Sequence, residues 1–133
     1  MNNDIRELAL YRLARAEESF NDAEILFKNE SLYSAVNRYY YAAFYAARAL
    51  LATKHLDSSK HSGVISLFQQ HFVKTEIIPP DIAKALSRSF EERIDIDYED
   101  FVSVPKEELE KIREQVKRFI AECKKVLKDM LEK

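Results

Sequence analysis

The amino-acid sequence predicts an all-α protein, built as an antiparallel up-and-down bundle of four to five helices. The chain has 133 residues, of which one is glycine and three are prolines, so few positions favour turns. Between these positions, apolar residues recur at spacings of three and four, which is the period of an α-helix. The length fits a single domain, which we expect to span residues 1–133.

Two long helices are predicted in the N-terminal part of the chain. Apolar residues recur from Ile5 to Phe27 and indicate a first helix that ends near Lys28 and Asn29. A turn over residues 29–31 leads into a second helix, which should run to about residue 54. This second helix contains the segment NRYYYAAFYAARALL, which is apolar on nearly every side.

A helix that is apolar nearly all round has to be covered on nearly all sides. One interpretation is a central helix whose tyrosine hydroxyl groups reach solvent. The other is a homodimer interface, because aromatic residues are enriched at interfaces and alanines permit close helix approach. The residues that we expect at this interface are Tyr41, Ala43, Tyr45, Ala46 and Ala49.

Turn and capping signals divide the rest of the chain into three further helices. Ser58 or Ser59 is suited to cap a short third helix that reaches about Phe72. Two prolines and an aspartate at residues 79–81 predict the start of a fourth helix. Residues 93–104 concentrate acidic side chains and predict a loop or a frayed helix end. Pro105 begins the last helix, which carries an apolar stripe to Met130.

Composition excludes several classes of protein. The formal net charge of -2 argues against a general nucleic-acid binder, although a local basic groove stays open. The single cysteine excludes an intramolecular disulfide and a cysteine zinc cage. We expect no metal site, since the acidic run at residues 95–100 lacks the glycine turn and ligand spacing of a calcium loop. We also expect no cofactor, and the lack of a glycine loop to hold phosphate excludes the common nucleotide-hydrolase architectures. The charged N-terminal segment and the lack of a long apolar run predict a cytoplasmic protein without membrane contact.

Three segments carry a resemblance to a known family. They are Asn37-x-x-Tyr40-Tyr41-Ala42-Ala43-Phe44-x-x-Ala47-x-x-Leu50-Leu51, Lys60-His61-Ser62-Gly63-Val64, and Arg93-x-Asp95-x-Asp97-Tyr98. Together they resemble the HEPN domain, and most of all the small stand-alone HEPN proteins of archaea and bacteria. The similarity extends from about Leu8 to Leu127. It implies a helical bundle, usually dimeric, in a family with metal-independent RNases and with toxins encoded beside minimal nucleotidyltransferases.

In the RNase members of this family, an arginine and a histidine four to six residues further on meet in a cleft between protomers. Arg93 matches that arginine by position. No histidine follows Arg93 in the chain, and Asp97 stands near the expected place, which argues against enzyme activity. His61 and His71 have no helical partner at metal-ligand spacing, so we expect each to be hydrogen-bonded or exposed.

Three functions remain open at this point. The leading hypothesis is a homodimeric partner of a minimal nucleotidyltransferase, in a toxin–antitoxin-type pair, with little or no catalysis of its own. The second is a metal-independent endoribonuclease that uses Arg93 at the dimer cleft, assisted by Asp97 and Tyr98. The third is a nucleotide-binding module in which Arg93, together with Arg88 or Lys60, holds phosphate. Arg93 could instead form a structural ion pair with Asp97, with Glu92 or with a carboxylate across the dimer.

Overall fold

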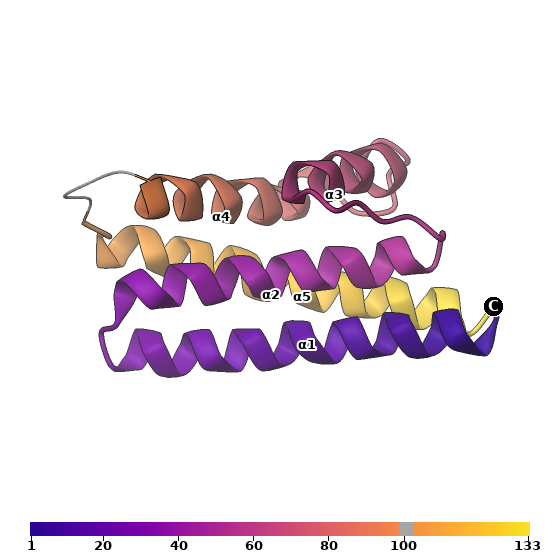
Figure 1. Ribbon diagram of the computed structural model, residues 1–133, viewed down its shortest axis with the longest axis horizontal. Helices are drawn as coiled ribbons and strands as arrows, with labels where there is room; N and C mark the ends of the chain where they lie inside the picture. The colour runs from indigo at the N-terminus through magenta and orange to yellow at the C-terminus, as the bar shows by residue number, and fades with distance from the viewer. Residues whose placement is uncertain (99–102) are drawn as a thin grey trace.

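The computed structural model describes residues 1–98 and 103–133 and confirms the all-α prediction. Its elements are α1 (Asn3–Lys28), α2 (Leu32–Ala52), α3 (His61–Phe68), the π-helical turn η1 (Gln69–Val73), α4 (Pro80–Tyr98) and α5 (Lys106–Leu131). Figure 1 shows α2 between α1 on one side and α3 with α4 on the other, while α5 lies behind α2. The sequentially adjacent long helices α1 and α2 run antiparallel, as do α4 and α5.

The helix boundaries follow from local chemistry. Asn2 caps α1, because its Oδ1 accepts hydrogen bonds from the backbone N–H groups of Asp4 and Ile5 at 2.7 and 3.2 Å. Proline occupies the first position of α4 at Pro80 and the N-cap of α5 at Pro105. Among the described helices, none is both long enough and apolar enough to cross a membrane.

Helix α2 forms the centre of the bundle. It packs against α1, α3, α4 and α5, and neighbouring helices cover most of its surface. Three of the alanines predicted at a dimer interface lie inside the bundle of a single chain: Ala43 and Ala46 are fully buried, and Ala49 is 1% exposed. Tyr41 and Tyr45 are half-buried and keep part of their surface exposed. The apolar segment of α2 therefore serves chiefly as core.

The structure corrects the expected loop or frayed helix end after Arg93. Helix α4 continues to Tyr98, so residues 93–98 are helical, while residues 99–102 lie outside the described part of the chain. Two contacts explain the extension. Ile96 is 2% exposed and packs into the core. Arg93 forms an ion pair with Asp97, which lies one helical turn further along α4. Burial and this pair together outweigh the unfavourable acidic residues at the helix end.

The third helix was predicted to reach about Phe72, and helical backbone does continue to that region, but its last turn is π-helical rather than α-helical. After Phe68 the backbone widens into η1, where the N–H of Lys74 donates to the carbonyl oxygen of Gln69 at 2.9 Å. This turn directs Phe72 and Val73 into the core. The chain then turns toward α4, so that α3 and α4 lie on the same side of α2 (Figure 1).

Candidate functional site

The guanidinium group of Arg93 lies on two tyrosine rings of α2. Its Cζ atom is 5.4 Å from the ring centroid of Tyr40 and 5.4 Å from that of Tyr41. Its Nε atom is 3.2 Å from Oδ2 of Asp97, so the structural ion pair considered from the sequence is present. The geometry of this contact is not that of a hydrogen bond. Among the described residues, the buried Nε of Arg93 has no hydrogen-bond partner.

A histidine reaches the same tyrosine rings from α3. His61 is the first residue of α3, and its ring stacks on Phe44 with centroids 4.4 Å apart and an interplanar angle of 13°. Its Nδ1 lies 2.5 Å from the hydroxyl oxygen of Tyr40, and its ring centroid is 5.9 Å from that of Tyr41. The fold thus brings His61 beside Arg93, although it precedes Arg93 in the chain.

Sequence reasoning missed this pairing because the histidine was sought after Arg93. The segment Lys60-His61-Ser62-Gly63-Val64 is part of the family resemblance, but the number of residues between His61 and Arg93 does not indicate that the two side chains meet. The expectation that His61 is hydrogen-bonded or exposed is met by its contact with Tyr40. The tertiary arrangement, rather than any local motif, brings the imidazole and the guanidinium group to the same two tyrosine rings.

The electrostatics of the site favour a neutral imidazole. Burial lowers the pKa of His61, and the positive charges of Arg93 and Arg48 lower it further. Burial raises the pKa of Tyr40 well above its usual range, so its hydroxyl group keeps its proton. If the Tyr40 oxygen accepts from Nδ1–H, Nε2 is a free base; in the other tautomer, Nε2–H is a donor. The pair can therefore take up or supply a proton.

A further arginine, Arg48, places positive charge near His61. Arg48 lies 5.7 Å from the ring centroid of Phe44, the ring on which His61 stacks. Asp57 accepts hydrogen bonds from Arg48 Nη2 at 2.9 Å and from Arg12 Nη2 at 3.3 Å. Two guanidinium groups thus share one carboxylate. This side of the bundle is locally basic, even though the chain as a whole carries a formal net charge of -2.

The other residues predicted at the site are less closely associated. Arg88 pairs with Glu108 across the contact between α4 and α5, with Nη2 and Oε1 2.5 Å apart. Lys60, rather than Ser58 or Ser59 as expected from the sequence, is the N-cap of α3; it is exposed, makes no capping hydrogen bond through its side chain and directly precedes His61. Tyr98 ends α4, and its side chain lies outside the described part of the structure. The structure therefore groups Arg93 and Asp97 with His61 and Tyr40, while Arg88 is engaged by α5.

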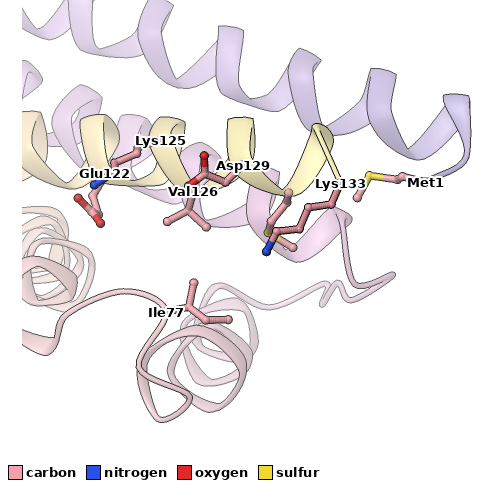
Figure 2. Close-up of a pocket in the computed structure, with 8 residues that line it drawn as sticks. Met1, Ile77, Glu122, Lys125, Val126, Asp129 and Lys133 are labelled. Carbon is pink, nitrogen blue, oxygen red and sulfur yellow. The ribbon is translucent and has the colours of Figure 1, made fainter.

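Two cavities differ in character. A cavity of about 530 Å³ borders α5 and the segment before α4, away from Arg93. Figure 2 shows Ile77 opposite the α5 side chains that include Val126 and Asp129. A smaller hollow of about 270 Å³ adjoins the site and is mostly polar. It is lined by Tyr33, Ser34, Asn37, Arg38 and Asp97.

Comparison with known proteins agrees with the resemblance seen in the sequence. A family model described as the HEPN domain matches residues 9–126. A Thermotoga maritima protein named "UPF0332 protein" is 39% identical over 128 residues, which cover 96% of this chain and 97% of the relative. A Methanocaldococcus jannaschii protein named "Putative toxin MJ0605" is 38% identical over 131 residues, which cover 98% of this chain and 97% of the relative.

A second Methanocaldococcus jannaschii protein, named "Putative toxin MJ0142", is 33% identical over 115 residues. The match covers 86% of this chain and 78% of that relative. The family model and these relatives span the helices that hold Arg93, His61 and Tyr40. This chain belongs to the HEPN domain family.

Proposed function

We propose that this HEPN protein is the toxin-type member of a toxin–antitoxin-like pair, and that its Arg93–His61 site cleaves RNA without a metal ion. The names of two relatives support the toxin role. One observation carries the chemistry: Arg93 and His61 lie on the same two tyrosine rings, and the pKa of His61 is lowered. The missing downstream histidine thus no longer argues against an enzyme.

Cleavage of RNA without metal requires a base for the 2′-hydroxyl proton, an acid for the leaving 5′-oxygen and a cation for the phosphorane. His61 is suited to the first task, since a neutral imidazole can accept the proton at Nε2. Arg93 is suited to the third, because its planar fork matches two phosphate oxygens. The O2′–P bond forms and the P–O5′ bond breaks, which leaves a cyclic phosphate and a 5′-hydroxyl group.

A second copy of the chain would supply the acid. A histidine that has just taken a proton on one side of the phosphorus is badly placed to protonate the oxygen that leaves on the other side. The resemblance implies a homodimer with its cleft between protomers, so we include dimerisation in the proposal. Because Ala43, Ala46 and Ala49 are buried, the exposed edges of Tyr41 and Tyr45 are the contacts we assign to the interface.

Dimerisation can be tested apart from catalysis. Tyr45→Glu places a charge on the proposed interface, whereas Ile25→Glu places one on a 60% exposed side chain of α1. We expect Tyr45→Glu to shift the sedimentation coefficient toward that of a monomer and Ile25→Glu to leave it unchanged. A wild-type protein that sediments as a monomer at all concentrations would remove dimerisation from the proposal.

The decisive experiment is RNA cleavage in the presence of a chelator. Wild type, Arg93→Ala, His61→Ala and the control Arg118→Ala, an exposed arginine of α5, are purified identically. Loss of a general base or of a transition-state cation typically lowers the rate by about a hundredfold or more. We therefore expect such a loss in the first two variants and none in the control. Absent or equal cleavage in all four proteins rejects the nuclease.

The ion pair between Arg93 and Asp97 favours a second candidate function. It neutralises the arginine within the chain and places a carboxylate where a phosphate would bind. This arrangement suits a protein with little catalysis of its own, whose role is to bind a partner; the resemblance implies a minimal nucleotidyltransferase. Stable co-purification with that partner, together with no RNA cleavage in chelator, is the result that supports this function.

A further inference from the structure

The polar hollow beside Arg93 lies between the start of α2 and the end of α4. Its volume is about 270 Å³, below the range of cavities that hold drug-sized ligands. Asp97 belongs to its lining and also approaches Arg93, with 3.2 Å between Oδ2 and Nε. A group bound in the hollow would therefore be next to a phosphate held by Arg93.

An aromatic ring is fixed at the edge of this hollow. The hydroxyl group of Tyr33 donates a hydrogen bond to the backbone carbonyl oxygen of Ile96, which ties α2 to the last turn of α4. The Tyr33 side chain is nevertheless 50% exposed. A ring that is held at its hydroxyl end and half exposed to solvent offers a surface on which a nucleobase can stack.

The polar groups in the hollow match the edge of a nucleobase. Asn37 is half-buried, and its amide presents a donor and an acceptor side by side, the pattern that amide side chains use to read bases. Arg38 and Ser34 are exposed and add a cation and a hydroxyl group. Among the described residues, the side chains of these three make no hydrogen bond or ion pair with one another or with Asp97.

We propose that the hollow is a nucleobase subsite for single-stranded RNA. It holds the base of the nucleotide adjacent to the phosphate at Arg93, with Tyr33 stacked on the base and Asn37 hydrogen-bonded to its edge. The strand must be single because pairing would occupy that edge and stacking would hide the face. This inference rests on the proposed RNA function and extends it from phosphate chemistry to base preference.

Binding of oligoribonucleotides tests the subsite. The probes are four short single-stranded homo-oligomers, one for each base, and an abasic strand of the same length, measured by fluorescence anisotropy in chelator. His61→Ala protein is used so that the strands stay intact. A bidentate amide contact discriminates by about 1 to 3 kcal/mol, so one base should bind at least about fivefold tighter than the abasic strand.

Substitutions in the hollow should remove this preference. Asn37→Leu, made in the His61→Ala protein, should lower the affinity for the preferred base to that for the abasic strand. Tyr33→Ala, at an exposed position on α2, is the second variant and should also lower it. Arg118→Gln on α5 is the control and should keep the preference. Thermal unfolding shows that each variant is folded before binding is measured.

The outcomes separate the subsite from the proposed function. If RNA binds but all bases and the abasic strand bind equally, or if the preference survives both Asn37→Leu and Tyr33→Ala, the subsite is wrong and RNA binding stands. If neither wild type nor His61→Ala binds any strand, the RNA function itself is wrong and the subsite with it. A preference lost in both variants and kept in the control supports the subsite.

Discussion

The close contact of Gly63 with Ser58 gives a test of how the chain positions His61. Gly63 lies in the first turn of α3, two residues after His61, and packs against the preceding loop. A Cβ atom added at Gly63 would lie 2.1 Å from Oγ and 2.8 Å from Cβ of Ser58. Both distances are far below ordinary van der Waals contact, so Gly63→Ala has to displace the loop or the helix turn.

The sign of the effect should depend on residue 58. Overpacking costs about 1 to 3 kcal/mol, while alanine in place of glycine in a helix stabilises by about 0.5 to 1 kcal/mol. With Ser58 present, Gly63→Ala should therefore lower the free energy of unfolding by about 1 kcal/mol. In a Ser58→Gly background both contacting atoms are gone, and the same substitution should raise the free energy of unfolding. The expected coupling is about 2 kcal/mol.

Urea denaturation of the four proteins, followed by far-UV circular dichroism, measures this cycle. Ser58→Gly also removes the acceptor for the N–H of Lys60, a 3.2 Å hydrogen bond, but this loss is common to both proteins with glycine at 58 and cancels from the comparison. An effect of Gly63→Ala that is the same in both backgrounds would refute the packing argument. A shift of the His61 imidazole signals in Gly63→Ala alone would show that the contact positions the site.

Three further predictions concern ionisable groups. Arg113 donates two hydrogen bonds to Glu24 and lowers its pKa, so this carboxylate stabilises the fold above its unfolded pKa of about 4.3. When the free energy of unfolding is measured against pH, this contribution should be lost as the pH falls below that value. Glu24→Gln should flatten that part of the curve, and an unchanged curve would contradict the role of the carboxylate. The pKa of His61 is lowered, so proton NMR should place it below about 6.5, and Arg93→Gln should raise it. Stability should decrease as the pH falls from about 6.5 through the folded pKa, because the unfolded chain binds the proton more readily. Cys123 is buried with a raised pKa, so a thiol reagent should label it only as the protein unfolds in urea; rapid native labelling would disagree with its burial.

Most of the helical architecture could be predicted from local signals. The C-terminal end of α1 and the starts of α4 and α5 agree with the sequence prediction, because the asparagine after α1 and the prolines before α4 and α5 are local signals that act on their own backbone. The end of α4 was missed for a tertiary reason. Acidic residues near a helix C-terminus oppose the helix dipole, and the burial of Ile96, together with the Arg93–Asp97 pair, shows why the helix continues.

The candidate site was predictable only in part. Arg93 and Asp97 lie one turn apart on one helix, so their pairing follows from sequence spacing. The approach of His61 depends instead on the path of the chain through α3, which no local period encodes. The surroundings of α2 were not predictable for the same reason. Periodicity identified the apolar sides of this helix, but not that its alanines are covered by other helices of the same chain.

The behaviour of Asp97 distinguishes the catalytic function from the non-catalytic one. A partly exposed ion pair one turn apart on a helix is worth about 0.3 to 0.5 kcal/mol, and this one lacks hydrogen-bond geometry. Hydrogen bonds between a guanidinium group and a phosphate contribute about 1.5 to 3 kcal/mol, so an arriving phosphate should displace the carboxylate of Asp97, whose side chain is 33% exposed.

On this reasoning Asp97 holds Arg93 in place until an anion binds, and it opposes binding by repulsion. Asp97→Asn keeps the size of the side chain and removes its charge. In the His61→Ala background, where the strand stays intact, it should therefore strengthen the affinity for a single-stranded oligoribonucleotide. With His61 present, cleavage by His61 and Arg93 should persist in chelator. If Asp97→Asn abolishes cleavage and leaves affinity unchanged, Asp97 takes part in the chemistry, as in the endoribonuclease hypothesis drawn from the sequence. If the protein binds no RNA with either residue at 97, the ion pair is structural and the partner-binding function is the better account.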